Sequence, residues 1–261
     1  TSIGAGNEAT AATTLAVGNK NNANAENAIA IGSYNNQNWT AGSWKTTPKN
    51  AGAYSTTVGQ YSDALGNFAV AVGYMNESKV QDTVTMGQFN KAKTMGGISI
   101  GKNNLTDSTN GGTNFAETRN ENSQIAIGRD NTATHLDTIA IGRETNATGS
   151  GATAIGARAD ASGNNSIAIG QSGKTSNRIT ASGENAIAIG QDSNVSNRGG
   201  VAIGKSAKSA GNGFAAGWAA EATGGSATAV GSHAIASGSN TFAGGWGATA
   251  SGDYYVAAGY N

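Results

Sequence analysis

A four-residue pattern of apolar, small or hydroxylated, apolar and glycine residues recurs along this 261-residue chain and constrains its fold more than any other feature. The Ile-Ala-Ile-Gly sequences at residues 29–32 and 187–190 are clear copies. Of the 16 intervals between the 17 glycines that end such copies, 12 are 14 residues long, one is 13, one is 20 and two are 27. A fixed short period indicates a solenoid, in which each repeat is a structural unit stacked on the next.

The second half of each repeat alternates between small and polar residues. Ala159, Ala161 and Gly163 alternate with Asp160 and Ser162, and the same rhythm returns in later repeats. A period of two is typical of a β-strand with one buried face. Fourteen residues therefore hold two short strands and two turns, and glycine supplies the positive φ that a tight corner requires.

Stacked repeats pair equivalent strands in parallel ladders at about 4.8 Å per turn of the solenoid. Side chains then form columns of Ile, Ala and Asn along the axis, around a narrow core that favours Ala. The strand at residues 186–189 is apolar at successive positions, so both of its faces need cover. One face looks into the solenoid, and we interpret the outer apolar stripe as a subunit interface.

Charge and composition exclude several classes of protein. Lys plus Arg and Asp plus Glu both number 16, so there is no net field to attract nucleic acid or an anionic membrane. The chain has no Cys, and no apolar run approaches the roughly 20 residues of a membrane-spanning helix. The first residues lack the pattern of a signal peptide, so we expect an export signal and a membrane anchor outside this sequence.

Three intervals exceed the period, and we predict loop insertions there, at about residues 33–54, 102–124 and 171–184 of a single head domain, 1–261. The first and third insertions combine aromatic and cationic residues, a mixture enriched in interface hot spots. The predicted partner-binding residues are Trp39, Trp44, Lys45, Lys49, Lys174 and Arg178. Trp39 and Trp44 have an alternative role, which is to pack the loop onto its own solenoid or a neighbouring subunit.

No catalytic or metal-binding residues are predicted, and no cofactor. His135 and His233 lie seven repeats apart, so they cannot form one site within a chain. Acidic residues such as Asp63 and Asp130 do not follow a calcium-binding repeat, and we expect them in solvated turns. The aromatic residues of the last repeats, Trp218 and Trp246 among them, are expected to fill a widening core or an interface rather than to bind sugar.

The Ile-Ala-Ile-Gly and Ala-x-Ala-x-Gly patterns at a 14-residue step resemble the YadA-like head of trimeric autotransporter adhesins over nearly the whole chain. The resemblance implies a left-handed parallel β-roll with three chains side by side, carried on a stalk at the bacterial surface and anchored in the outer membrane by a C-terminal β-barrel. It also implies attachment to host cells or extracellular matrix proteins. Residues 102–107 are similar to the head of the Moraxella ubiquitous surface proteins, which would make fibronectin or laminin plausible ligands.

Other functions stay open on the sequence. A structural spacer without its own ligand would need only the repeats. An ice-binding or carbohydrate-binding face would need regular ranks of Thr, which are not sustained here. An acyltransferase of the left-handed β-helix type is disfavoured, because those enzymes resemble hexapeptide repeats with 18 residues per turn and use a His base.

Overall fold

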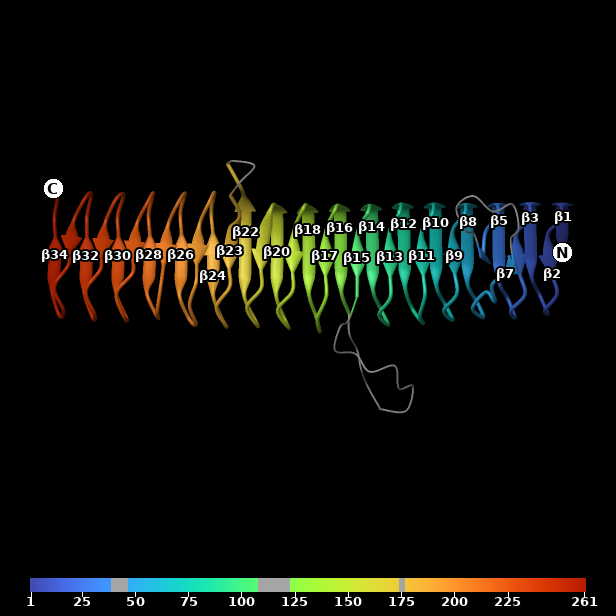
Figure 1. Ribbon diagram of the computed structural model, residues 1–261, viewed down its shortest axis with the longest axis horizontal. Helices are drawn as coiled ribbons and strands as arrows, with labels where there is room; N and C mark the ends of the chain where they lie inside the picture. The colour runs from blue at the N-terminus through green and yellow to red at the C-terminus, as the bar shows by residue number, and fades with distance from the viewer. Residues whose placement is uncertain (39–46, 108–122, 174–176) are drawn as a thin grey trace. The chain divides into compact units, whose positions relative to one another are not determined.

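The computed structural model describes residues 1–38, 47–107, 123–173 and 177–261, which form two compact units, Thr1–Asp137 and Thr138–Asn261. Each unit is a parallel β-solenoid in which a long strand and a short strand alternate along the chain (Figure 1). No helix occurs within the described ranges. The all-β parallel solenoid predicted from the repeat is thereby confirmed, while the left hand and the trimer stay predictions.

The described residues of the first unit form eight long strands and seven short ones that stack in the solenoid, besides the two strands of a hairpin. The long strands are β1 (Ser2–Ala5), β3 (Leu15–Asn19), β5 (Ile29–Ser33), β8 (Thr56–Gln60), β10 (Val70–Tyr74), β12 (Val84–Gln88), β14 (Ile98–Lys102) and β16 (Ile125–Arg129). The short strands are β2 (Glu8–Ala9), β4 (Asn22–Ala23), β9 (Asp63–Ala64), β11 (Glu77–Ser78), β13 (Lys91–Ala92), β15 (Leu105–Thr106) and β17 (Thr132–Ala133).

The second unit repeats this plan. Its long strands are β18 (Ile139–Arg143), β20 (Thr153–Ala157), β22 (Ile167–Gln171), β24 (Ile187–Ile189), β26 (Val201–Ile203), β28 (Phe214–Ala216), β30 (Thr228–Val230), β32 (Phe242–Gly244) and β34 (Val256–Ala258). Its short strands are β19 (Asn146–Ala147), β21 (Ala159–Ala161), β23 (Ile179–Ala181), β25 (Asn194–Val195), β27 (Lys208–Ser209), β29 (Glu221–Ala222), β31 (Ile235–Ala236) and β33 (Thr249–Ala250).

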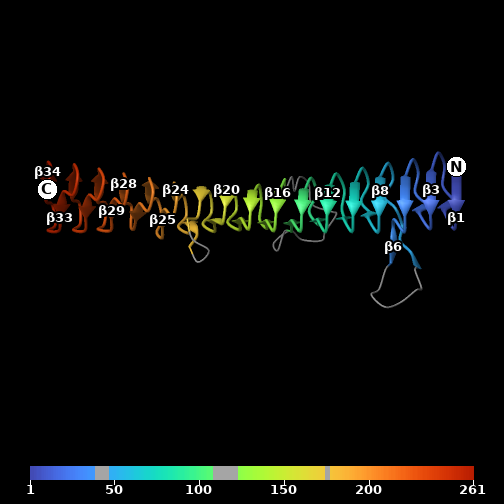
Figure 2. The same ribbon diagram turned by 90° about the horizontal axis from the view of Figure 1, so that it is seen from above.

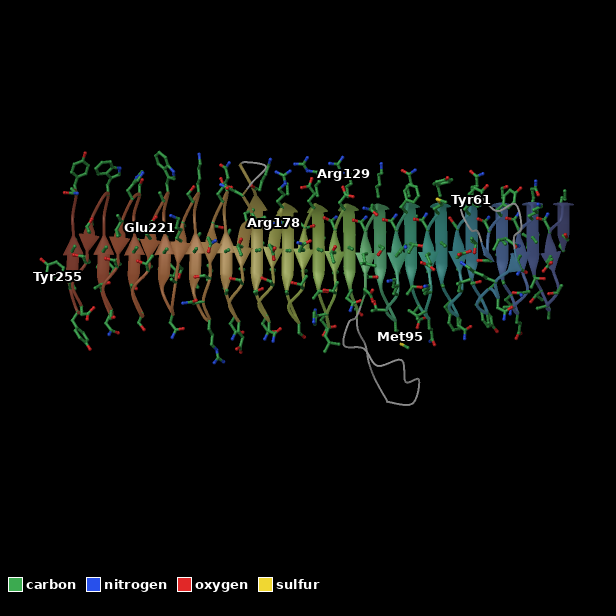
Figure 3. All side chains as sticks on the ribbon, viewed as in Figure 1. Tyr61, Met95, Arg129, Arg178, Glu221 and Tyr255 are labelled. Atoms are coloured by element: carbon green, nitrogen blue, oxygen red, sulfur yellow. The ribbon has the colours of Figure 1, made fainter. Side chains whose placement is uncertain are left out.

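Equivalent residues of neighbouring repeats pair in the ladders, as the 14-residue period requires. Gly87 of β12 pairs with Gly73 of β10 on one side and with Gly101 of β14 on the other. We call the turn after each long strand the first corner and the turn after each short strand the second corner. In the first unit, Tyr61 and Arg129 point outward at the first corner and Met95 at the second (Figure 3).

The repeat glycine near the end of a long strand is required by the close approach of the next repeat. At Gly87 the backbone φ is +114°, and a Cβ built there would lie 2.1 Å from the carbonyl oxygen of Gly101. No L side chain fits such a contact without moving the backbone. The recurrent glycine is thus a consequence of stacking as well as of turn geometry.

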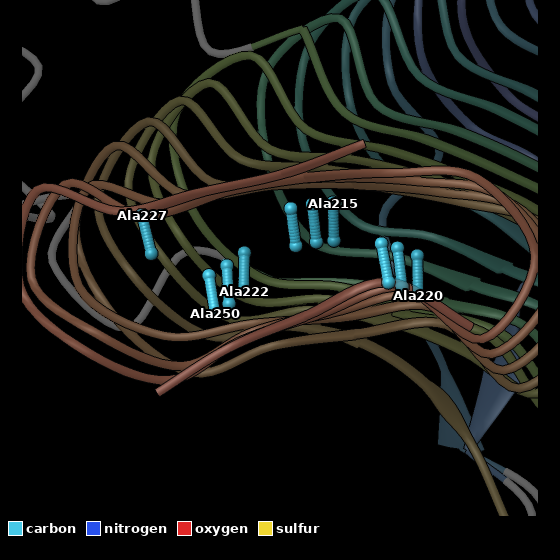
Figure 4. Close-up of a cluster of buried hydrophobic side chains, with 10 residues drawn as sticks. Ala215, Ala220, Ala222, Ala227 and Ala250 are labelled. Atoms are coloured by element: carbon cyan, nitrogen blue, oxygen red, sulfur yellow. The ribbon is translucent and has the colours of Figure 1, made fainter. Parts of the chain in front are cut away.

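The core of the solenoid consists almost wholly of alanine. Within the described residues, every buried apolar side chain is alanine except Ile179 and Val195. In the second unit, Ala215 of the long strand faces Ala222 and Ala250 of the short strands between the two layers (Figure 4). The two strands of a repeat lie too close together for larger side chains, as the composition predicted.

A buried asparagine column lines the first corner of the first unit. The Asn90 side-chain amide donates to the carbonyl oxygens of Met86 (2.9 Å) and Gly101 (2.7 Å), and to Oδ1 of Asn76 (3.0 Å). Asn104 repeats the pattern one turn later, with its amide on Oδ1 of Asn90. Asn90 and Asn104 therefore each bind the asparagine before them, and Asn90 satisfies backbone carbonyls of two repeats.

The strands that flank each long interval pair directly with one another. β5 pairs with β8, β14 with β16 and β22 with β24, each in register. Between β5 and β8, the short strands β6 (Gln37–Asn38) and β7 (Thr47–Pro48) form an antiparallel hairpin. In Figure 2, β6 leaves the stack of strands at the side of the first unit.

Candidate functional site

The long strands present an apolar outer face in both units. In each strand the central residue of the apolar triplet points into the core, while the residues on either side are half-buried or exposed, as in Ile98, Ser99 and Ile100 of β14. Parallel pairing places these outer residues in unbroken columns. The apolar stripe predicted from the sequence is confirmed, with Met86 and Ile203 each 41% exposed.

The short strands present a polar outer face. In β21, Ala159 and Ala161 are buried and Asp160 between them is half-buried. Ion pairs join several of these outer residues, for example Lys208 and Glu221 with Nζ and Oε1 2.8 Å apart. Charges of opposite sign pair on this face, so it carries no strong field of either sign.

The base of the β6–β7 hairpin is fixed to the first unit through buried polar groups. The Lys49 amide donates to the carbonyl oxygen of Asn36 at 2.9 Å, and the Asn22 side-chain amide donates to the carbonyl oxygen of Lys49 at 2.8 Å. The Asn36 side-chain amide in turn donates to the Asn22 carbonyl oxygen at 2.8 Å. Because Asn22 and Asn36 are fully buried, this end of the hairpin is held firmly in place.

Lys49, a predicted partner-binding residue, is engaged in an ion pair with Asp63 of β9. Its Nζ lies 2.5 Å from Oδ2 of Asp63, and the lysine side chain is about a quarter exposed. Asp63 itself is only 7% exposed, so the expectation that it lies in a solvated turn was wrong. It was wrong because the segment that follows the hairpin places the Lys49 side chain against Asp63.

The Asp63 carboxyl group has a raised pKa. Burial is the largest cause, and the nearby charge of Glu77 adds to it. The hydrogen bond and charge of Lys49 and the backbone of Gln37 lower the pKa, but by less. Oδ1 of Asp63 is buried without a hydrogen-bond partner, which agrees with the unfavourable burial of the carboxylate.

Arg178, predicted from the third insertion, lies against the surface of the second unit. Its Nη1 donates to the carbonyl oxygen of Glu144 at 3.1 Å and lies 3.9 Å from Oδ2 of Asp160. A shallow open depression of about 390 Å³ beside it is lined by residues that include Asp192 and Lys208. Arg178 thus bridges neighbouring repeats and keeps part of its side chain exposed.

The structure brings Lys49 and Arg178 to separate units and does not test their predicted role in binding a partner. The other predicted site residues lie outside the described residues: Trp39, Trp44, Lys45 and Lys174.

Rows of aromatic rings follow the first corner in both units, and we did not predict them from the sequence. In the first unit the rings of Tyr34, Tyr61, Tyr74 and Phe89 follow one another at centroid distances of 5.1, 6.1 and 5.5 Å. In the second unit the row is Trp218, His233, Trp246 and Tyr260, at 4.8, 6.2 and 5.0 Å. The signal was present in the sequence, because Tyr74, Trp218, Trp246 and Tyr260 each directly follow a repeat glycine.

Of the two roles expected for Trp218 and Trp246, filling a widening core was wrong, and filling an interface stays a prediction. Their side chains are 56% and 50% exposed, and the core beneath them is alanine, as elsewhere. The core does not widen there, because alanine fills the space between the two strands in these repeats too.

No group of three or more His, Cys, Asp or Glu side chains that could hold a metal occurs in the part of the chain that the structure describes. His135 lies at a second corner, half-buried, and His233 lies exposed at a first corner. A search of the described residues found no helix with the length and hydropathy to cross a membrane.

Comparison with known families gives a match to a repeat family. The family model of the YadA head domain repeat (2 copies) matches residues 9–35, 125–145, 147–172, 181–207 and 222–248. No curated protein matches the chain. YadA heads belong to adhesins at the bacterial cell surface, form trimers and bind host factors, and neither the family nor the solenoid fold is enzymatic in kind. The YadA head repeats and the parallel β-solenoid together identify this chain as a YadA-like head of the trimeric autotransporter adhesin type.

Proposed function

We propose that three copies of this chain assemble side by side through their outer apolar faces into a head that attaches the bacterium to host extracellular matrix or cell-surface proteins. The observation that carries the assembly is the outer column of apolar side chains on the long strands, in which Met86, Ile100 and Ile127 stand in register. A continuous exposed apolar stripe on a soluble surface is explained by a partner, and a closed assembly of identical chains covers it in every copy.

Attachment follows from multivalency. Three copies of a weak site in one assembly gain avidity through a high effective concentration. A binding surface is proposed in each unit separately, with Trp39, Trp44, Lys45 and Lys49 of the first insertion in one and Lys174 and Arg178 of the third insertion in the other. The fixed base of the β6–β7 hairpin supports this proposal, because a firmly anchored loop loses less conformational entropy on binding.

The family membership supports the rest of the proposal. The head acts without catalysis and without a cofactor, as a virulence factor, and is anchored in the outer membrane by a region outside this sequence. Fibronectin and laminin are the proposed ligands.

Replacement of the hairpin loop tests the binding site. Deleting residues 35–50 would remove the buried Asn35 and Asn36, so a smaller change is needed. Because Asn38 pairs with Thr47, residues 39–46 can be replaced by Asn-Gly, which closes a two-residue hairpin. We expect the variant to keep its circular dichroism and thermal transition and to lose most of its solid-phase binding to immobilised fibronectin and laminin.

The controls separate loop binding from other functions. Arg178→Ala changes the third insertion and leaves the hairpin intact, so it shows which loop contributes more. Full binding by both variants would contradict the proposed loop site and place the ligand on the solenoid face. Binding of the unaltered head to neither protein would contradict them as ligands and favour a spacer that has no ligand of its own.

A further inference from the structure

Two tyrosine rings stack on one another at the first corner of the first unit. Tyr34 and Tyr61 each lie two residues after a repeat glycine, and their backbone φ values, 57° and 54°, are nearly the same. The strands that lead into them, β5 and β8, pair directly, and the Tyr61 amide donates to the carbonyl oxygen of Ser33 at 3.0 Å. The two side chains therefore leave the solenoid one ladder step apart and in the same direction, outward as Tyr61 shows in Figure 3.

The ring geometry distinguishes this pair from the other tyrosines. The ring centroids of Tyr34 and Tyr61 lie 5.1 Å apart, and the ring planes are inclined by 21°. Tyr74 meets Tyr61 by its edge, at 6.1 Å and 87°. Tyr54 stacks on Phe68 rather than on a second tyrosine. Among the described residues, the pair at the first corner is thus the one case of tyrosines at equivalent positions of directly paired repeats.

Stacked tyrosines are a substrate for one-electron oxidants. The oxidant takes one electron from each ring, each phenol releases its proton to solvent, and two phenoxyl radicals result. The unpaired electron of each radical lies partly on the ring carbons next to the C–O carbon, and two of these carbons join in a new C–C bond. The hydrogen on each joined carbon then moves to the oxygen and restores the phenol. The product, dityrosine, has two hydrogen atoms fewer than the two tyrosines.

We infer that Tyr34 and Tyr61 form an oxidative cross-linking site, at which a diffusible one-electron oxidant converts the pair to a dityrosine within one chain. Hydrogen peroxide with a haem peroxidase is a source of such oxidants outside cells. Both rings are half-buried, so each radical is held beside its partner instead of having to meet another molecule.

The cross-link would join the two repeats that flank the first insertion. Tyr34 and Tyr61 are 27 residues apart in the sequence and adjacent in the solenoid. A covalent bond that closes such a loop restricts the unfolded chain. We expect the oxidised head to unfold at a higher temperature than an equally oxidised Tyr34→Phe variant, which cannot form the link.

Oxidation of the whole head with persulfate and a photoactivated ruthenium–bipyridine complex tests the inference. Trypsin cleaves after Lys45 and Lys49 and thereby separates Tyr34 from Tyr61. We expect mass spectrometry to find peptides 21–45 and 50–79 linked, two hydrogen atoms below their summed mass, in the protein band that migrates as a single chain on a denaturing gel. Peptide fragmentation should place the link at Tyr61 and not at Tyr54.

Conservative variants separate ring stacking from exposure. Tyr34→Phe should abolish the linked peptides, and Tyr74→Phe should leave them unchanged. Phe68→Tyr is the matched gain, because Tyr54 and Phe68 stack at 5.1 Å and 14°. This variant should add a second link, to Tyr54, within peptide 50–79.

Two outcomes would overturn the inference. One is dityrosine at Tyr254 or Tyr260, which are 80% and 84% exposed, without the link between peptides 21–45 and 50–79. The other is a link from Tyr34 that occurs only between chains. The site is independent of the proposed protein ligands: the variant with Asn-Gly in place of residues 39–46 keeps both tyrosines and should still form the link, so either proposal can fail alone.

Discussion

At the scale of single residues, glycine at the end of each long strand is the strictest requirement of this fold. Gly87 has a φ of +114°, and a Cβ added to it would lie only 2.1 Å from the Gly101 carbonyl oxygen. A side chain at this position would therefore meet both backbone strain and steric overlap. The neighbouring strands that pair with β12 on both sides prevent the backbone from relaxing.

We predict that Gly87→Ala lowers the stability of the solenoid by about 3 kcal/mol, measured as a lower midpoint of thermal unfolding by circular dichroism. Gly225→Ala is the control, because a Cβ at Gly225 would have its nearest neighbour, Ser239 Oγ, at 3.9 Å. That variant should stay within about 0.5 kcal/mol of the unaltered protein. Equal effects of the two changes would contradict the steric explanation.

Asp63 predicts a dependence of stability on pH. Burial raises the pKa of this carboxyl group in the folded state, so folding favours the protonated form. The stability that Asp63 contributes is therefore fully present below its unfolded pKa and is lost as pH rises through its folded pKa. We expect Asp63→Asn to unfold at a higher temperature than the unaltered protein at pH 7, and the difference to shrink as the pH is lowered.

The measurement compares the midpoints of thermal unfolding of the unaltered protein and of Asp63→Asn at pH 7 and at lower pH. Lys49 stays partly exposed and can be solvated when Asp63 loses its charge. A destabilised Asp63→Asn variant at neutral pH would show that the ion pair with Lys49 outweighs the cost of burial.

At the scale of elements, the two units stabilise the same corner differently. The first unit uses the buried asparagine column, whereas alanine occupies the equivalent position in later repeats of the second unit: Ala207, Ala220, Ala234 and Ala248. Asparagine satisfies the carbonyl groups that end two long strands, and alanine fills the corner by packing alone.

We predict that Asn90→Ala destabilises the first unit by about 3 kcal/mol, because it leaves the carbonyl oxygens of Met86 and Gly101 without their amide donor. Asn103→Gly is the control, since Asn103 is exposed and its φ of 56° suits glycine. Hydrogen exchange should report the loss at β12 and β14. Protection there that matches the unaltered protein would contradict a structural role for the column.

At the scale of the whole molecule, the outer apolar face predicts assembly. Met86→Asp combined with Ile203→Asp places a charge in the outer column of each unit and should convert the proposed trimer, three times 25.8 kDa, to a 25.8 kDa monomer in light scattering. Thr249→Asp on the polar outer face of β33 should leave the mass unchanged. A monomeric unaltered chain would contradict the interface.

The sequence alone was sufficient for the plan of the solenoid. Residues 14 apart, such as Gly73 and Gly87, are partners in a ladder, so the sequence period is itself a map of spatial contacts. The alanine core, the asparagine column and the apolar outer face follow from reading equivalent positions of successive repeats. A local repeat encodes these features because every repeat contacts its neighbours in the same way.

The tertiary structure decided two kinds of feature: the direction of the side chains at the corners, and the path of the chain where it rejoins the solenoid after an insertion. The sequence shows that Trp218 and Trp246 lie in the last repeats, but it does not show the direction of their rings. The tight alanine core forces these rings outward. From its sequence position, Asp63 is predicted to be a solvated acid. In the structure, the segment after the β6–β7 hairpin, which interrupts the 14-residue period, places Lys49 against Asp63 of β9. Contacts made outside the repeat have no counterpart in the neighbouring repeats, so the sequence period carries no information about them.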